Sequence, residues 1–246
     1  FLDPSMMYSS AIYPNKTSTL EVAAEHKLDI ICRKLDLKKS HHVIEIGSGW
    51  GGFAIHAAKH YGCHVTTTTI SKEQYKYVCK KIKQLKLEKY IKVVFKDYRE
   101  LTGKYDKLVS IEMIEAVGHK FYDSYFKKIS ELLNKNGDAL IQAITIRDQR
   151  YQQAIRSVDF IQKYIFPGSC IPSLNVIQNS ITCSGDMVVN DLSDIGHHYA
   201  KTLADWRKNF TMNNKGIIKL GFDEKFLRMW LFYFCYCEGG FLEKSI

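Results

Sequence analysis

The hydrophobic pattern divides the chain into short apolar runs and longer amphipathic segments. As far as residue 146, runs rich in β-branched residues alternate with segments whose apolar positions recur every three or four residues. The β-branched runs predict buried strands, and the segments with recurring apolar positions predict helices. Strands are expected at residues 43–46, 65–70, 91–95, 107–111 and 139–146, and helices at 19–35, from 53, from 71 and over 121–133. This alternation predicts a doubly wound, mostly parallel α/β sheet.

The alternation breaks after the fifth predicted strand. Residues 150–165 predict an aromatic-rich helix, and a loop with Pro167-Gly168 follows it. Further on, Met187-Val188-Val189 predicts a sixth strand, and helices are expected over 195–210 and from Asp223 to about Cys237. We interpret the segment from about 148 to 184 as a lid insertion, because a cover over the carboxyl ends of the strands meets the ligand crevice. The chain from 1 to 246 is thus expected to form a single domain with this insertion.

A glycine-dense turn follows the first predicted strand. The segment reads Val43-Ile44-Glu45-Ile46-Gly47-Ser48-Gly49-Trp50-Gly51-Gly52. Gly47 and Gly49 can adopt backbone angles that are closed to other residues, and they let a ligand approach the main chain. The helix after the turn presents free backbone N–H groups at its N-terminus. The turn therefore predicts a nucleotide-type cofactor site at the carboxyl end of a strand.

Neighbouring residues discriminate between cofactor classes. The spacing Gly47-x-Gly49-x-x-Gly52 also matches the dinucleotide fingerprint, but the second strand ends at Thr69-Ile70 without the acidic residue that binds the ribose in that fingerprint. Glu45 lies inside the first strand, where a carboxylate disfavours a pyrophosphate and suits a cationic sulfonium. Asp97-Tyr98 follows the third strand and could meet an adenine amino group. The pattern favours S-adenosylmethionine and disfavours a nicotinamide oxidoreductase.

The formal net charge is +9, and lysines are concentrated between residues 75 and 92. The apolar positions of this stretch fit a helix, so the lysines form either a solvated outer face or a surface that attracts a polyanion. The chain lacks the aromatic-interleaved basic groove of nucleic-acid binders. We therefore expect no nucleic-acid partner, and an anionic membrane surface is the favoured polyanion.

The remaining composition is that of an ordinary globular protein, with 246 residues, 46% hydrophobic and 25% charged. The 7 cysteines are scattered without metal-binding spacing, so no metal site is expected, and a reducing compartment is indicated. The sequence shows no signal peptide and no apolar stretch long enough to span a membrane. We expect a cytoplasmic protein that is peripheral at the inner membrane surface.

Several longer motifs are more specific than the glycines alone. They are Met7-Tyr8-Ser9-Ser10-Ala11, Glu45-Ile46-Gly47-Ser48-Gly49-Trp50-Gly51, Thr69-Ile70-Ser71-Lys72-Glu73-Gln74, Glu112-Met113-Ile114-Glu115-Ala116-Val117-Gly118-His119, the run from Asp159 to Gly168 and the run from His198 to Arg207. In these motifs the chain resembles the cyclopropane fatty-acid synthase and mycolic-acid methyltransferase family. The resemblance covers nearly the whole chain and implies the Rossmann-like fold of class I S-adenosylmethionine-dependent methyltransferases.

The resemblance implies the activity of a cyclopropane-fatty-acyl-phospholipid synthase. In this reaction the cis double bond of an unsaturated acyl chain takes the methyl group of S-adenosylmethionine, and the carbocation loses a proton from the new methyl as the ring closes. The family uses a bound bicarbonate as the base. The catalytic pocket corresponds here to Ser10, Glu115, Gln142, Ile144 and Tyr199. Glu112 lies nearer the strand and is not assigned to the site.

The resemblance also assigns the cofactor site and shows two departures from the family pattern. The cofactor-binding residues are Tyr8, Ser9, Glu45, Gly47, Ser48, Gly49, Trp50, Gly51, Thr69, Ile70, Ser71, Gln74, Asp97 and Tyr98. The family usually has cysteine where Ser10 stands, a harmless change if the main chain makes the contact. It often has histidine where Gln142 stands, and glutamine can donate to an anion but cannot shuttle a proton.

Several alternatives stay open from the sequence. A methyl-branching lipid methyltransferase and an O- or N-methyltransferase of small molecules share the cofactor, and a catalytically weak lipid-binding remnant is an alternative of another class. Unsaturated phospholipid acyl chains are the expected partners, and a homodimer is left open. The family usually carries an N-terminal lipid-docking region and a last strand after the final helix, and both are expected to lie outside the residues given.

Overall fold

The central sheet of the computed structural model, which describes residues 1–246, is parallel throughout. Its strands are β1 (His42–Ile46), β2 (His64–Thr69), β3 (Ile91–Phe95), β4 (Tyr105–Ile111) and β5 (Leu133–Gln142), in the order β3-β2-β1-β4-β5. The reversal of strand order beside β1 is the switch point at which doubly wound sheets bind ligands. In the register, Val43 of β1 pairs with Val65 of β2 and with Lys107 of β4. The predicted doubly wound parallel α/β sheet is therefore confirmed.

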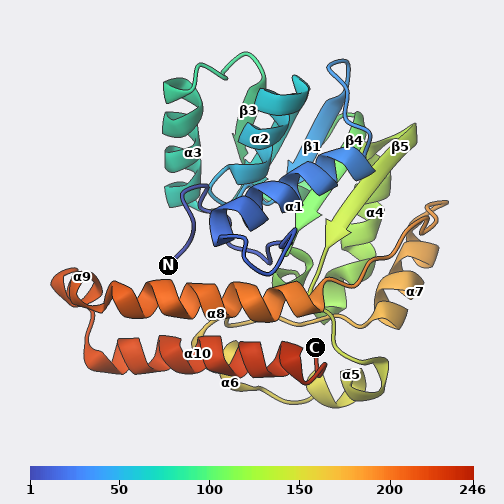
Figure 1. The fold of residues 1–246 in the computed structure, drawn as a ribbon. Helices are drawn as coiled ribbons and strands as arrows, with labels where there is room; N and C mark the ends of the chain where they lie inside the picture. Colours follow the sequence, from blue (N-terminus) through green and yellow to red (C-terminus); the bar gives the residue numbers. More distant parts are fainter.

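Helices cover both faces of the sheet (Figure 1). On one face lie α1 (Leu20–Lys34), α2 (Gly52–Tyr61) and α3 (Lys72–Gln84), and on the other lie α4 (Tyr122–Leu132) and α7 (Leu174–Ser184). Successive strand residues point to opposite faces, so Val43 packs with the α1–α3 side and Ile44 with the α4 side. Each face of β1 is thus buried in its own apolar core.

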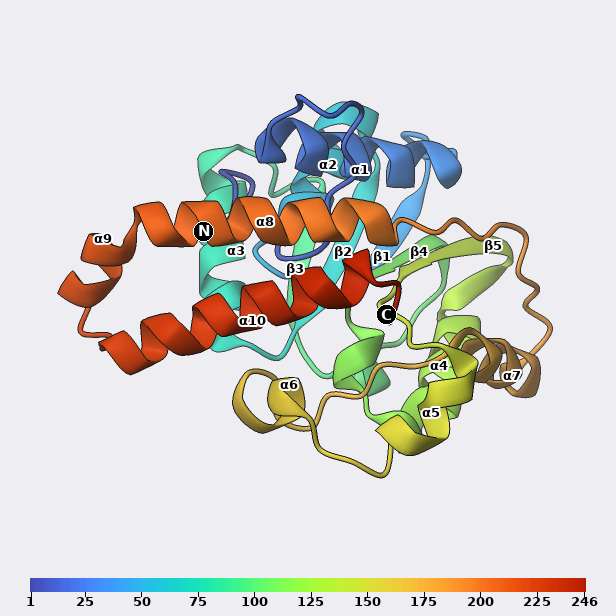
Figure 2. The ribbon, with the colours of Figure 1, turned by 60° about the horizontal axis from the view of Figure 1, so that its bottom comes forward.

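A pair of long helices lies across the carboxyl ends of the strands. These helices are α8 (Gly196–Met212) and α10 (Glu224–Leu242), joined by the short α9 (Asn214–Lys219). Figures 1 and 2 show α8 and α10 side by side, with α5 (Asp148–Ala154) and α6 (Phe160–Tyr164) at the same end of the molecule. None of these or the other helices combines the length and the apolar character that a membrane span requires.

The structure corrects three predicted elements. β5 begins directly after α4 and ends at Gln142, so the strand is earlier than the expected 139–146. The expected helix over 150–165 is divided into α5 and α6. Met187–Val189 is not a strand: the segment is irregular and Val188 is 73% exposed. An apolar run forms a strand only where a neighbouring strand can pair with it, and β5 pairs with β4 alone.

The segment expected to form the lid is only partly at the ligand end of the sheet. α5 and α6 lie near the carboxyl ends of the strands, whereas α7 lies beside α4 on the flank (Figure 2). Val176, Ile177 and Ile181 of α7 pack against the core on the α4 side. The role of residues 148–184 as a lid stays a prediction.

Candidate active site

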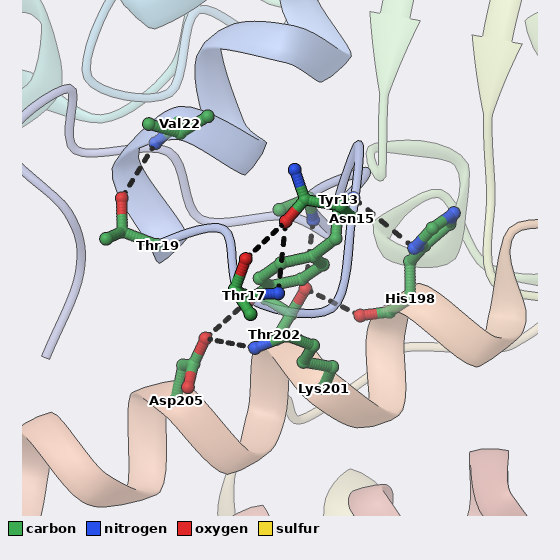
Figure 3. Close-up of polar contacts among 10 residues, drawn as sticks. Tyr13, Asn15, Thr17, Thr19, Val22, His198, Lys201, Thr202 and Asp205 are labelled. Carbon is green, nitrogen blue, oxygen red and sulfur yellow. Dashed lines mark hydrogen bonds and ion pairs between the residues drawn. The ribbon is translucent and has the colours of Figure 1, made fainter.

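The N-terminal segment is fastened to α8 by polar contacts (Figure 3). The hydroxyl of Tyr13 donates to Asp205 over 2.8 Å, and the amino group of Lys201 lies 4.2 Å from the centre of the Tyr13 ring. Closer to the site, the backbone N–H of Ala11 donates to the hydroxyl of Thr202 over 3.1 Å. These contacts hold residues 8–10 over the carboxyl ends of the strands.

The residues of this segment contact different parts of the site. The ring of Tyr8 lies among aromatic side chains of the α8–α10 layer, 5.3 Å from the ring of Trp206. The hydroxyl of Ser9 accepts a hydrogen bond from the buried Lys27 over 2.6 Å. The backbone N–H of Ser10 donates to Glu112 over 2.8 Å, so the main chain at position 10 contacts a glutamate, and the expected contact with a bicarbonate stays a prediction.

The glycine turn is tied to the adjacent strand and leaves space above Gly49. The N–H groups of Gly47 and Ser48 both donate to the carbonyl of Thr68, over 3.2 and 2.8 Å. Gly49 has φ +48°, and a Cβ built on it would meet nothing within 4 Å. This turn is therefore open on the side where a ligand can approach the backbone. Trp50 borders it, with its ring edge-to-face on Tyr77 at 5.3 Å.

Glu45 is buried beneath the turn, at 3% exposure. Its Oε2 accepts a hydrogen bond from the hydroxyl of Thr67 over 2.6 Å. Burial raises the pKa of Glu45 to about 8, and the Thr67 hydrogen bond and the charge of Lys27 oppose the rise. A cation bound above the turn would favour the ionised form of this carboxyl group further.

The end of β2 and the start of α3 form the next part of the site. The Ser71 side chain caps α3 by accepting from the N–H of Gln74, whose side-chain oxygen accepts from the hydroxyl of Thr69 over 2.8 Å. Ile70 between them is 73% exposed and presents an apolar side chain to solvent at the strand end. This group of residues lies next to the glycine turn because β1 and β2 are adjacent and parallel.

Asp97 and Tyr98 follow β3, but their side chains have partners within the protein. Asp97 accepts from the backbone N–H, Nε and Nη2 of Arg99, and these contacts lower its pKa. The ring of Tyr98 packs edge-to-face on Tyr125 at 5.6 Å. A carboxylate oxygen can accept more than one hydrogen bond, so Asp97 can still meet an amino group.

The residues at the three adjacent strand ends fit a ligand of the S-adenosylmethionine type. The open glycine turn lets a ligand approach the backbone. The buried carboxyl group of Glu45 suits a cationic group, and the exposed side chain of Ile70 suits a flat ring. Of the predicted cofactor residues, those at the ends of β1 and β2 are brought together directly by the Thr68 carbonyl. Tyr8 and Ser9 face the aromatic layer and Lys27 instead.

Glu112 is the centre of the predicted catalytic pocket. Its Oε1 accepts from the backbone N–H of Ser10 and from Nε2 of Gln142, each over 2.8 Å. Its Oε2 accepts from the hydroxyl of Tyr199 over 2.6 Å. This residue was not assigned to the site from the sequence. The available signal was an acidic residue directly after a central strand, where ligand-binding groups gather in this fold.

Glu115 is the second buried carboxyl group, on the turn after β4. Its Oε1 accepts from the backbone N–H of Ile144 over 2.5 Å, and its Oε2 is buried without a hydrogen-bond partner. Burial and the charge of Glu112 raise the pKa of Glu115 to about 8. The other four predicted catalytic residues thus contact two glutamates, of which Glu115 was predicted and Glu112 was not.

The donor set does not fit a bicarbonate in addition to these side chains. The donors that the resemblance assigns to the ion already bind the carboxyl groups of Glu112 and Glu115. An anion placed here would also be repelled by a neighbouring carboxylate. We therefore derive no step through bicarbonate.

Lys27 of α1 is the buried cation of the site, at 1% exposure. Burial lowers its pKa to about 8, while the charges of Glu112, Asp3 and Glu45 oppose this change. Burial raises the pKa of Glu112, and the hydrogen bonds from Tyr199 and Ser10 and the charge of Lys27 oppose this rise. The lysine therefore favours the ionised form of the carboxyl group at the centre of the pocket.

An aromatic layer closes the pocket from the α8–α10 side. The ring of Tyr199 stacks on Phe241 at 4.4 Å, and its edge meets Trp206 at 6.0 Å. Tyr233 of α10 lies with its hydroxyl 3.4 Å from that of Tyr8. The carboxyl groups of the pocket therefore lie next to aromatic side chains.

Comparison with known proteins gives one family across the chain. The family model described as mycolic acid cyclopropane synthetase matches residues 1–246. A solved mycolic acid cyclopropane synthase complexed with SAH and CTAB is 28% identical, with a TM-score of 0.92, and the match covers 100% of this chain and 88% of that chain.

Two relatives have names that describe different reactions. The tuberculostearic acid methyltransferase of Mycobacterium tuberculosis is 36% identical over 98% of this chain and 58% of its own length. The cyclopropane-fatty-acyl-phospholipid synthase of Escherichia coli is 36% identical over 100% of this chain and 61% of its own length. The chain therefore spans about three fifths of these relatives.

Proposed function

Because the chain belongs to the mycolic acid cyclopropane synthetase family of S-adenosylmethionine-dependent methyltransferases, we propose that it alkylates a double bond in an unsaturated lipid acyl chain. The observation that carries the proposal is a pair of glutamates, the buried Glu115 and the half-buried Glu112, beside the open glycine turn and beneath an aromatic layer. S-adenosylmethionine supplies an electrophilic methyl group to such a site.

The residues of the pocket suit a reaction that passes through positive charge. Attack by a double bond leaves a cation on the acyl chain, and a nearby carboxylate stabilises that cation in a dry site. The aromatic side chains of Tyr199 and Trp206 lie in the layer beside the pocket, and aromatic rings can stabilise a nearby cation. The apolar side chains of the α8–α10 layer exclude water, which would otherwise trap the cation as an alcohol.

We propose cyclopropanation of phospholipid acyl chains as the specific reaction. The relative from Escherichia coli supports this choice by its name, whereas the mycobacterial relative supports the alternative of methyl branching. An O- or N-methyltransferase of small polar substrates is less well supported, because the pocket is closed by aromatic rather than polar side chains. A lipid-binding remnant would not require the pair of glutamates.

The direct test is transfer of label from methyl-labelled S-adenosylmethionine to vesicles of unsaturated phospholipid, followed by mass analysis of the extracted lipid. A gain of one CH2 with loss of the alkene signal is expected for cyclopropanation. Labelled lipid with a branch or an exocyclic methylene would select the methyl-branching alternative. Cofactor binding without labelled lipid would reject the lipid substrate and favour a small-molecule methyltransferase.

We also propose peripheral contact with an anionic membrane through the lysine-rich face of α3. Lys76, Lys80 and Lys83 are exposed on this helix, and each lysine near an anionic surface contributes about 1 kcal/mol. Replacing all three by glutamine is expected to weaken binding to anionic vesicles about 100-fold. Raised salt should weaken binding of the native protein in the same direction.

Vesicle sedimentation at two salt concentrations measures this effect. Replacing Lys120, Lys127 and Lys135, which are exposed elsewhere on the molecule, provides a control with the same change of net charge. Equal losses in the two triple variants would show that overall charge, rather than α3, governs the attraction. Binding that is insensitive to salt would make the lysines an ordinary solvated face.

A further inference from the structure

We propose that the carboxylate of Glu112 takes the place of a bound bicarbonate and is itself the general base of the reaction. The inference rests on the proposed alkylation of a double bond, because only that reaction requires a base at this position. Its observational basis is the set of hydrogen bonds that converge on Glu112, a half-buried residue at the carboxyl end of β4.

The hydrogen bonds around Glu112 are those that a small anion would need. Two donors bind Oε1, from the main chain of Ser10 and the amide of Gln142, and the hydroxyl of Tyr199 binds Oε2. A carboxylate and a bicarbonate present the same planar pair of oxygens to such donors. Since Oε2 accepts only one of these hydrogen bonds, it retains a lone pair that can take a proton.

The other groups of the pocket are less suited than Glu112 to act as the base. The amide of Gln142 and the N–H of Ser10 have no proton-accepting function at neutral pH. The hydroxyl of Tyr199 is itself a donor to Glu112, and burial raises its pKa well above the ordinary value. Glu115 has one backbone donor and faces the charge of Glu112, so it is the member of the pair that retains a proton more readily.

The charges around the pocket favour one internal anion at the Glu112 position. Lys27 stabilises the ionised carboxylate of Glu112, together with the three donors. A bicarbonate would need to share this single buried lysine with Glu112 and Glu45. The charges of Lys27 and Glu112 therefore compensate each other without a second, mobile anion.

The backbone at Glu112 is consistent with a functional position. Its φ of +48° lies in the left-handed region, which non-glycine residues rarely adopt. Its N–H donates to the carbonyl of Gln142 over 2.8 Å, which fixes the residue between β4 and β5. Strained backbone of this kind persists where surrounding contacts enforce it, and it is concentrated at active sites.

The proposed step balances in charge and atoms. The S–CH3 bond of the sulfonium breaks with its electron pair kept by sulfur, while the π electrons of the alkene form the new C–CH3 bond. Glu112 takes a proton from this methyl group, and the released C–H pair closes the ring onto the cationic carbon. The proton then leaves the neutral Glu112 for solvent, which restores the carboxylate.

The first test is the Glu112→Gln variant in the labelled-lipid assay. Gln at 112 has nearly the same shape, and the Tyr199 hydroxyl can turn to accept from the new amide, so the fold is expected to stay intact. Loss of a general base should reduce kcat by at least about 100-fold while cofactor affinity stays unchanged. The exposed Glu25→Gln variant is the matched control, with native activity expected.

The second test is titration with sodium bicarbonate, by calorimetry and by activity, against sodium chloride of equal ionic strength. The native protein should show no saturable bicarbonate binding and no loss of turnover in bicarbonate-depleted buffer. Glu112→Gly suits the left-handed backbone and frees the three donors, so this variant should bind bicarbonate and regain activity when it is added. Formate is a second probe of the same vacated position.

The outcomes separate the inference from the proposed function. Retention of more than a tenth of native kcat by Glu112→Gln, or saturable bicarbonate binding by the native protein, would overturn the inference even if lipid is alkylated. A native protein that transfers no methyl group to lipid would refute the proposed function and, with it, the role as base. In that case the bicarbonate titration would still decide whether Glu112 occupies the anion position.

Discussion

Replacing Gly49 by valine is expected to abolish cofactor binding while leaving the protein folded. A Cβ at this position meets no protein atom within 4 Å, so the added side chain would project into the open space above the turn. That space is where we place the cofactor, and the φ of +48° also disfavours a β-branched residue. A loss of at least about 3 kcal/mol, or about 100-fold in Kd, is expected in calorimetric titration with S-adenosylmethionine.

Gly221 provides a control, because its backbone also adopts a positive φ. It lies between α9 and α10 with φ +95° and also has no atom within 4 Å of a built Cβ. Gly221→Val should therefore carry similar backbone strain without obstructing the site. Equal affinity of the Gly49 variant and the native protein would place the cofactor elsewhere, whereas equal losses in both variants would indicate strain as the cause.

Replacing Trp206 by alanine is expected to cause the largest loss of stability, about 3–5 kcal/mol. The side chain is fully buried, at 0% exposure, among residues of α8, α10 and the N-terminal segment. Its ring lies 5.8 Å from Phe1, 5.3 Å from Tyr8 and 6.0 Å from Tyr199. Thermal unfolding should show Tm lowered by about 10 °C, since about 2–4 °C per kcal/mol is typical at this size.

The matched variant is Trp206→Phe. Nε1 of Trp206 is buried without a hydrogen-bond partner, and an unsatisfied buried donor costs about 1–3 kcal/mol. Phenylalanine removes this cost and keeps most of the aromatic packing, so we expect a loss of less than about 2 kcal/mol. A Trp206→Ala variant as stable as the native protein would show that the α8–α10 layer folds independently of this contact.

The strands were the most predictable part of the fold. β-branched runs bounded by turn residues placed β1 to β4 within two residues of their observed bounds. The start of β5 was missed because its first residues, from Leu133 to Gly137, lack the apolar pattern of a strand, and the register of the strand pair is irregular there. Met187–Val189 shows the opposite error, since its apolar pattern carries no information about whether a partner strand is available.

The catalytic pocket was predicted residue by residue only where the family resemblance supplied positions. Ser10, Gln142, Tyr199 and Ile144 were assigned in this way, and the structure brings them to the same place through β4 and the α8 contacts. Glu112 was missed because its role depends on contacts with residues far away in the chain, such as Ser10, 102 positions earlier. The spacing of residues within a short motif carries no information about such distant contacts.

The buried acidic groups also have a consequence for the proton balance of folding. Burial raises the pKa of Glu45 and of Glu115 from the ordinary 4.5 to about 8, so the folded state binds more protons than the unfolded chain between these values. Their contribution to the free energy of unfolding is therefore fully present below pH 4.5 and is lost as pH rises through about 8. His56, with its pKa lowered by burial from 6.5 to about 4, acts in the opposite direction below pH 6.5.

The net loss should therefore begin near pH 4.5 and be steepest between about pH 6.5 and 8, where Tm measured by calorimetry is expected to fall most. Above this range Lys27 reverses the trend, since its pKa is lowered from 10.5 to about 8 and its contribution is lost as pH falls through that value. A flat Tm across this interval would contradict the burial of these groups. The site thus opposes folding most strongly at mildly alkaline pH.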